Sequence, residues 1–295
     1  MDKETPALEH WAGRRQSLCE TIHPVQVRQM AAAMDDAVRL AKPDSAPLPE
    51  GWHWLYFNPL EVQSRLGPDG HPQRGDFLPP VALPRRMWAG SRLHWERAFS
   101  VGSTVTKSSD ILKVTHKSGR SGVMVFVTVA HLYSDAAGPI LSEEHDIVYR
   151  DLPSPSKRAA LAETGAQVRA GTHAFERSGN SIKAVKADAT LLFRYSAATF
   201  NGNRIHYDVD YCRDVEGYPG LAVHGPLIAT LLLNFVENEI AVARFIKKFE
   251  FRASKPTFDL SGFHLHASTE NNGQYDVWSS NNLGEVGIAG RITLA

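Results

Sequence analysis

The feature that most constrains the fold is a pattern that occurs twice along the chain: a helix followed by four short strands. β-Branched and aromatic residues alternate with turn residues in eight stretches, which predicts strands there. The first four are residues 91–99, 108–116, 123–133 and 140–150, and the second four are 247–253, 262–268, 272–281 and 284–294. Consecutive strands of this length indicate antiparallel meanders, and their repetition indicates a weak internal duplication.

A predicted helix precedes each set of strands. Between Val27 and Ala41, apolar residues recur at intervals of three and four, as in a helix with one buried face. The apolar stretch from His224 to about Ala243 predicts a second, longer helix. Each helix must bury its apolar side against the concave face of a sheet. We therefore predict an α+β fold in which two hotdog modules share one chain, a double hotdog.

A change in composition separates the two modules. In residues 151–186, alanine, serine and charged residues replace the strand pattern, so we expect a connector with some helix. This divides the chain into an N-terminal module at 1–150, the connector at 151–186 and a C-terminal module at 187–295. The segment from Trp52 to Gly90 is dense in proline, glycine and aromatic residues, and we expect it to be ordered but irregular.

Charge and cysteine content narrow the class of protein. Lysine plus arginine number 32, as do aspartate plus glutamate, so neither nucleic acid nor a membrane surface is an expected partner. Cys19 and Cys212 lie far apart and have neither a disulfide-framework nor a metal-ligand spacing. The charged N-terminus lacks the apolar core of a signal peptide, and the longest apolar run, 227–233, is too short to span a membrane. We expect a cytoplasmic protein.

The segment that carries chemistry is FRYSAATFNGNRIHYD, residues 193–208, followed by EGYPGLAVHGPLIATLL, residues 216–233. It resembles the loop-and-helix signature of the MaoC-type (R)-specific enoyl-CoA hydratases. The positions that match this signature are His206, Asp208, Gly217, Tyr218, His224 and Gly225. Asn201 stands where those hydratases carry the catalytic aspartate.

The longer form of the motif, SAATFNGNRIHYD with HGPL at the helix start, resembles one branch of these enzymes. That branch contains the itaconyl-CoA and mesaconyl-C4-CoA hydratases and the mitochondrial 3-hydroxyacyl-thioester dehydratases. WHWLYF, FLPPVALPRRMWAG and EEHDIVYR in the N-terminal half also have counterparts there. In this branch Asn201 is the usual residue, whereas Asn203 stands where histidine is commoner. The resemblance implies that the C-terminal module is catalytic and that the N-terminal module covers the substrate.

Hydration of an enoyl thioester needs a base for the water, an acid for the α-carbon and stabilisation of the enolate oxygen. We expect His206 to be the single acid and base, because imidazole exchanges protons near neutral pH. Asn201 would orient the water through its amide, although turn formation alone would also explain an asparagine there. Gly225 would present its backbone N–H and the positive end of the helix dipole to the thioester oxygen.

The other candidate residues each have two readings. For Asp208, a role as helix N-cap is favoured over a role as an acid. For His224, a structural role at the helix start is favoured over substrate binding. Arg204 could bind a substrate carboxylate or pair with one of the protein's own acids. Arg85 and Arg86 could bind that carboxylate or the CoA phosphates, or could simply be packed.

The function expected first is hydration of itaconyl-CoA to citramalyl-CoA. Hydration of mesaconyl-C4-CoA follows closely, and a 3-hydroxyacyl-thioester dehydratase of fatty acid metabolism is a further enzyme alternative. A non-catalytic module that binds acyl thioesters is the alternative of another class. The expected partner is an acyl-CoA, with CoA as part of the substrate and with no separate cofactor or metal. Because paired hotdogs bury their free sheet edges by association, a homodimer or higher homo-oligomer is expected.

Overall fold

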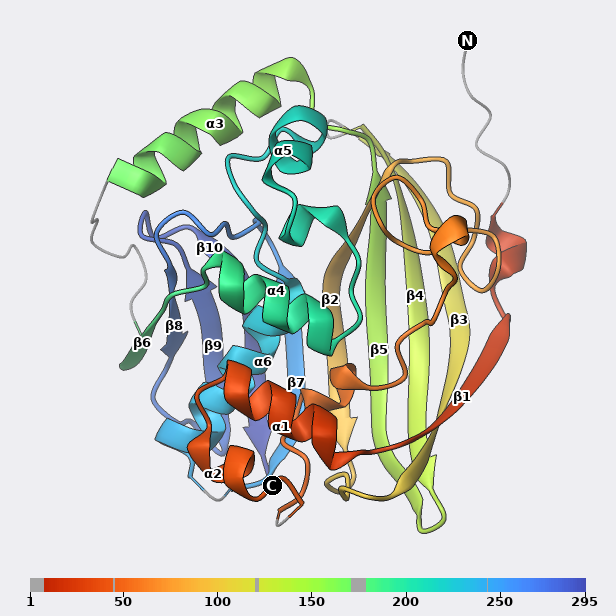
Figure 1. The fold of residues 1–295 in the computed structure, drawn as a ribbon, viewed down its shortest axis with the longest axis vertical. Coiled ribbons are helices and arrows are strands. Elements are labelled where there is room, and N and C mark those ends of the chain that lie inside the picture. The colour runs from red at the N-terminus through yellow and green to blue at the C-terminus, as the bar shows by residue number, and fades with distance from the viewer. Residues whose placement is uncertain (1–7, 45, 120–121, 171–178, 243) are drawn as a thin grey trace.

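The computed structural model describes residues 8–44, 46–119, 122–170, 179–242 and 244–295. Within these residues, ten strands form one continuous antiparallel sheet in the order β1-β3-β4-β5-β2-β7-β10-β9-β8-β6 (Figure 1). The strands are β1 (Arg15–Thr21), β2 (Arg85–Trp95), β3 (Thr104–Gly119), β4 (Gly122–Asp135), β5 (Gly138–Arg150), β6 (Ser181–Val185), β7 (Ile246–Ala253), β8 (Phe263–Ala267), β9 (Gln274–Ser280) and β10 (Val286–Leu294).

The sheet order reveals the duplication. The first five strands lie in the order first, third, fourth, fifth, second, and the last five repeat that order from the opposite edge. The two second strands, β2 and β7, pair at the centre, from Gly90 opposite Arg252 to His94 opposite Lys248. The predicted α+β double hotdog is confirmed, with the two modules joined into one sheet by this single strand pair.

Two strands were not expected from the sequence. β1 pairs with β3 and β6 pairs with β8, so each is the edge strand of its module. Both are mostly exposed and carry mixed polar residues, RQSLCET and SIKAV, so neither shows a clear apolar alternation. Because β6 lies at residues 181–185, inside the stretch expected to be a connector, the second module begins before residue 187.

The helices are α1 (Pro24–Ala33), α2 (Ala37–Ala41), α3 (Pro155–Ala170), α4 (Ala189–Ala198), α5 (Val209–Tyr211) and α6 (Gly225–Phe235). The first expected helix is therefore divided in two, and Asp35, with a φ of 57°, lies at the break. α6 continues as a wider π-helical turn to Ile240, close to the predicted end. α4 includes the first residues of the motif segment 193–208. None of the described helices combines the length and apolar character needed to cross a membrane.

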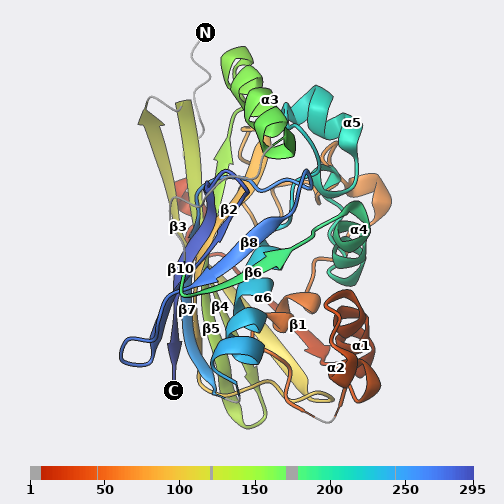
Figure 2. The same ribbon diagram turned by 90° about the vertical axis from the view of Figure 1, so that its left-hand side faces the viewer.

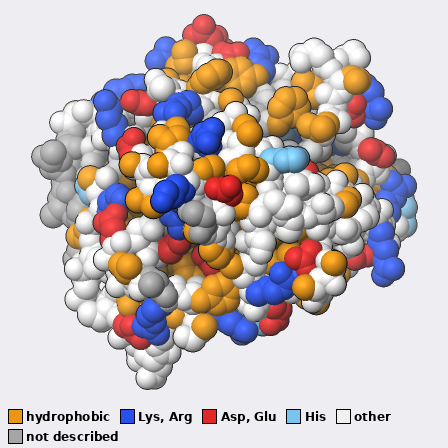
Figure 3. All heavy atoms as spheres, turned by 60° about the horizontal axis from the view of Figure 1, so that its bottom comes forward, with side chains coloured by type: hydrophobic (Ala, Val, Ile, Leu, Met, Phe, Trp, Pro, Cys, Tyr) orange, Lys and Arg blue, Asp and Glu red, His pale blue; other side chains and the backbone are white. Residues whose placement is uncertain are grey.

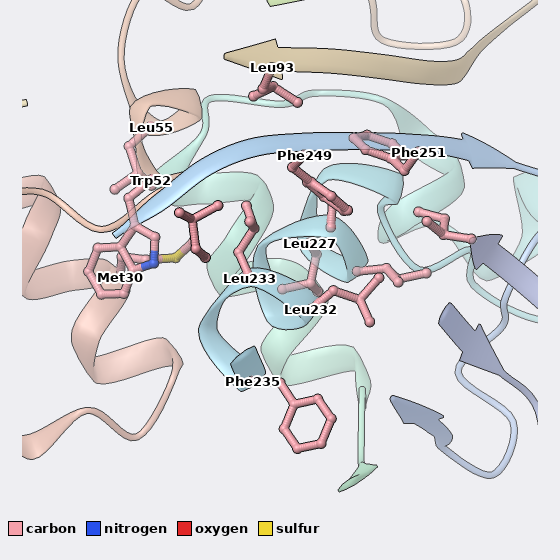
Figure 4. Packing of buried hydrophobic residues seen from close by; sticks show 14 of the residues in the cluster. Met30, Trp52, Leu55, Leu93, Leu227, Leu232, Leu233, Phe235, Phe249 and Phe251 are labelled. Carbon is pink, nitrogen blue, oxygen red and sulfur yellow. The ribbon is translucent and has the colours of Figure 1, made fainter. Parts of the chain in front are cut away.

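The helices cover the two modules differently. Figure 2 shows α6 lying on the strands of the second module, with α4 and α1 outside it as a further layer. α6 contributes a continuous apolar side to the core, and Figure 4 shows its residues beside β7 together with Met30 and Trp52 of the first module. Burial of this apolar surface is the main favourable contribution to folding.

The first module has no comparable helix on its own strands among the described residues. α1 packs against α2 and α4, whereas from the short 3₁₀ turn Trp52–Leu55 the side chains of His53 and Trp54 reach Glu143 of β5. Part of the concave face of β2–β5 is thereby left open to a cavity, described below. On the outer surface drawn in Figure 3, basic and acidic side chains are interspersed with hydrophobic ones, in line with the equal numbers of the two charges.

The close approach of β2 to β7 gives a test of the junction. Gly90 lies at a bulge in β2, and a Cβ there would collide with the backbone carbonyl oxygen of Phe251. We expect Gly90→Ala to lower the free energy of unfolding by about 1–3 kcal/mol, measured by urea denaturation. Gly119→Ala is the control, because no atom lies within 4 Å of its Cβ position. Equal stability of the two variants would contradict a tight junction.

Candidate active site

A cavity of about 620 Å³ lies between the concave face of the first module and the segment that carries the catalytic motif. Strands β2–β5 and the residues around Trp54–Pro59 form one side of it. On the other side, its walls include Ser196, Asn201, Tyr207 and Pro226, from α4, the following loop and the start of α6. Both modules therefore contribute to one site.

His206 ends a short 3₁₀ turn, Arg204–His206, and is almost completely buried. Its ring Nδ1 lies 2.7 Å from the carbonyl oxygen of Ala222. A carbonyl can only accept, so Nδ1 carries the hydrogen and Nε2 is left as a proton acceptor. Burial lowers the pKa of His206 to about 4. The imidazole is therefore neutral at physiological pH, as a base must be.

His224 supports the ring of His206. The two imidazoles are stacked, with centroids 3.6 Å apart and planes inclined by 17°. His224 Nε2 lies 2.8 Å from the Ser196 hydroxyl, and the side chain is fully buried. Burial holds its pKa well below the usual value. His224 also precedes α6, so the stack brings His206 to the first residue of that helix, Gly225.

Asn201 faces the cavity from the loop that follows α4. Its side-chain oxygen accepts a hydrogen bond from the backbone N–H of Asn203, 3.0 Å away. Phe200 precedes it in a left-handed conformation with a φ of 48°, which turns the chain sharply at this point. The amide nitrogen of Asn201 makes no hydrogen bond within the described residues, so it is available to a ligand in the cavity.

A turn of the first module, around Gly70, contacts the loop that carries Asn201 and His206. A Cβ at Gly70 would collide with the carbonyl of Gly202, so only glycine permits this approach. The backbone N–H of Arg204 donates to the carbonyl of Asp69 at 2.9 Å. Asp69 also bonds the ring of His71, 2.9 Å away, which lines the cavity.

Gly225 begins α6, and the N–H groups of a first helical turn have no partners within the helix. A Cβ on Gly225 would lie 3.4 Å from the indole of Trp88, in tight contact. Trp88 and the next helical residue, Pro226, both line the cavity. The start of α6 thus directs its positive end toward the same space.

Arg204 and Asp208 are engaged with each other. The guanidinium of Arg204 lies 2.8 Å from the Asp208 carboxylate and donates to the Pro68 carbonyl at 3.1 Å. Asp208 also accepts from the backbone N–H of Tyr211 at 2.9 Å, so it caps α5 as expected. Arg204 is not among the residues that line the cavity.

The two neighbouring arginines of β2 point to different places. Arg85 is buried and lies 2.7 Å from the carboxylate of Glu216, with a further hydrogen bond to Tyr218. Arg86 lines the cavity and lies opposite Tyr149 of β5. Of the three arginines singled out in the sequence, Arg86 is the one that the structure places at the site.

Several cavity residues were not singled out in the sequence. They are Ser196 and His71, together with a polar group on the first module's strands: Lys107, His131, Glu143 and His145. In EEHDIVYR, strand alternation puts Glu143 and His145 on one face of the strand and the residues next to them on the other. Alternation alone does not say which of these faces points inward.

Comparison with known proteins agrees with this geometry. A family model described as hydroxyacyl-thioester dehydratase type 2 matches residues 51–259. A mesaconyl-C(4)-CoA hydratase from Chloroflexus aurantiacus is 41% identical over 257 residues, which is 87% of each protein. A mitochondrial hydroxyacyl-thioester dehydratase type 2 from Schizosaccharomyces pombe is 24% identical over 238 residues, 72% of this chain and 74% of that protein.

Solved structures share the fold. A MaoC-like dehydratase has a TM-score of 0.68, covering 98% of this chain and 99% of its own at 15% identity. A MaoC-like dehydratase from Phytophthora capsici has a TM-score of 0.65, covering 96% and 95% at 15% identity. The resemblance found in the motif is thereby confirmed. This chain belongs to the hydroxyacyl-thioester dehydratase type 2 family and shares the fold of the MaoC-like dehydratases.

Proposed function

We propose that this protein is a hydro-lyase that adds water reversibly across the double bond of a short enoyl-CoA bearing a free carboxylate. The observation that carries the proposal is the neutral, buried His206, which is fixed by Ala222 and stacked on His224, and whose Nε2 makes no hydrogen bond within the described residues. Asn201, in the same loop, supplies an amide that faces the cavity.

In hydration, the Asn201 amide holds a water molecule against the β-carbon. His206 Nε2 takes one proton from the water as its oxygen bonds to that carbon, and electron density moves to the thioester oxygen. The backbone N–H of Gly225 and the helix dipole stabilise this enolate. The imidazolium then gives the proton to the α-carbon, which completes the addition and restores the base. Since burial disfavours the charged imidazolium, transfer of the proton from His206 to the α-carbon is favourable.

Mesaconyl-C4-CoA is the preferred substrate, because the relative with 41% identity over 87% of both chains carries that activity in its name. Itaconyl-CoA, the substrate expected first from the motif, is the second candidate. The family also includes a hydroxyacyl-thioester dehydratase, so uncharged enoyl thioesters belong in the test. Arg85 and Arg204, which are paired with the protein's own acids, are proposed to fix the loops around the site.

His206→Gln tests the base. We expect kcat/KM for mesaconyl-C4-CoA to fall roughly 10²- to 10⁴-fold, followed by the ultraviolet absorbance of the enoyl thioester. The exposed His10 provides the matched control, and His10→Gln should leave the rate unchanged. Full activity of His206→Gln would remove the proposed base. Wild-type protein inert with charged and uncharged enoyl-CoA esters alike would favour a non-catalytic binding module instead.

The pH profile tests the protonation state of the same group. Because burial lowers the pKa of His206 to about 4, the active neutral form persists below the usual histidine range. The acid limb of kcat/KM should therefore have its midpoint near pH 4, with circular dichroism at each pH to confirm that the chain stays folded. A midpoint near 6.5, the unperturbed value, would show that the base is solvated rather than buried.

A further inference from the structure

The concave faces of the two modules have the same topology but different chemistry. In the second module, the face covered by α6 is largely apolar and includes Phe249, Phe251, Leu265, Val277 and Ile292. In the first module, the strands that line the cavity carry Lys107, His131, Glu143 and His145. Ionisable side chains on an inward sheet face have a high desolvation cost, so they need a specific reason.

The strand register shows that these side chains share one face. Lys107 of β3 lies opposite Tyr133 of β4, and His131 of β4 lies opposite Glu143 of β5. His145 follows Glu143 by two residues, so it points to the same side. These four ionisable side chains and Tyr133 all line the cavity.

The carboxylate of Glu143 already has four hydrogen-bonding side chains around it. Ser91, Trp54, His53 and Tyr133 lie 3.2, 3.3, 3.4 and 3.4 Å from its carboxylate oxygens. Burial on its own raises the pKa of this carboxyl, but the hydrogen bond from His53 and the surrounding groups outweigh it and hold the pKa below the usual value. Glu143 is thus an ionised group whose hydrogen bonds are made by other side chains.

Lys107 has no such arrangement. Within the described residues, its ammonium makes no hydrogen bond and has no carboxylate within 4.0 Å; its contact is with the ring of Tyr133, whose centroid is 5.5 Å away. Burial lowers the pKa of Lys107, and the negative charge of Glu143 opposes that shift. A desolvated ammonium facing a cavity is stabilised when an anion enters it.

A continuous row of rings connects the start of α6 to this lysine. Trp88 lies 3.4 Å from the position that a Cβ on Gly225 would occupy, and its ring centroid is 5.0 Å from that of His145. The ring centroids of His145 and His131 are 6.1 Å apart, and those of His131 and Tyr133 are 6.4 Å apart. The cavity therefore runs from the helix start, along the first module's sheet, to Lys107.

We propose that Lys107 binds the free carboxylate of the acyl group, with His131 and His145 as neutral neighbours, and so selects dicarboxylic enoyl-CoA esters. This inference rests on the proposed function and names the residue that sets its substrate class. Burial lowers the pKa of His131 to about 2 and that of His145 to about 4, so both rings are uncharged and able to donate one hydrogen bond. Arg86 also lines the cavity; it lies opposite Tyr149 of β5 and in the electrostatic field of Asp69.

The test compares esters that differ in the carboxylate. One pair is mesaconyl-C4-CoA and 3-methylcrotonyl-CoA, in which a methyl group replaces the carboxylate; the other is the longer pair hex-2-enedioyl-CoA and hex-2-enoyl-CoA. The measured quantity is the ratio of kcat/KM values within each pair. Wild type should favour the charged member, and Lys107→Met should reduce that ratio roughly 10- to 100-fold for at least one pair. Lys107→Arg should retain part of the preference.

Lys113→Met is the matched control, because Lys113 is an exposed lysine of the same strand, and it should keep the wild-type ratio. An unchanged ratio in Lys107→Met for both pairs, with an active wild type, would overturn this inference and leave the hydro-lyase standing. Loss of the preference in Arg86→Met but not in Lys107→Met would also overturn it, by moving the anion site to the other cation. A wild type inert with all four esters would overturn the proposed function and this inference together.

Discussion

The pairing of β2 with β7 is the interaction on which the rest of the structure depends. It joins two five-stranded modules edge to edge, so that neither module has its second strand exposed. It also fixes the open concave face of the first module next to the loop that carries Asn201 and His206. The catalytic groups and most of the cavity wall come from different modules, and this strand pair sets their relative position.

The two modules share a strand order but differ in the helix that covers their strands. The second module keeps a long helix, α6, which fills its concave face and offers the unpaired N–H groups of its first turn. In the first module, helix α1 packs on other helices, and part of the concave face of the strands lines a cavity. The second module therefore carries the proposed catalytic residues, and the first module supplies most of the cavity wall.

The double hotdog was predictable because most of its strands are rich in β-branched and aromatic residues and are separated by turns, and the motif was recognisable because it is contiguous in the sequence. The edge strands β1 and β6 were not, since polar edges carry little alternation. The arginines show a different limit. Arg85 and Arg86 are adjacent and therefore face opposite sides of β2, but the sequence does not say which side holds Glu216 and which the cavity. The cluster around Lys107 was missed because its members lie on three strands that only the register brings together.

The close backbone contact between Gly70 and Gly202 makes the two modules depend on each other. The turn of one module touches the backbone of the other's catalytic loop with no side chain between them. A side chain at either glycine would push the two loops apart, so a substitution at one position also changes the surroundings of the other. The shape of each loop therefore depends on its contact with the other, so neither module carries the complete site by itself.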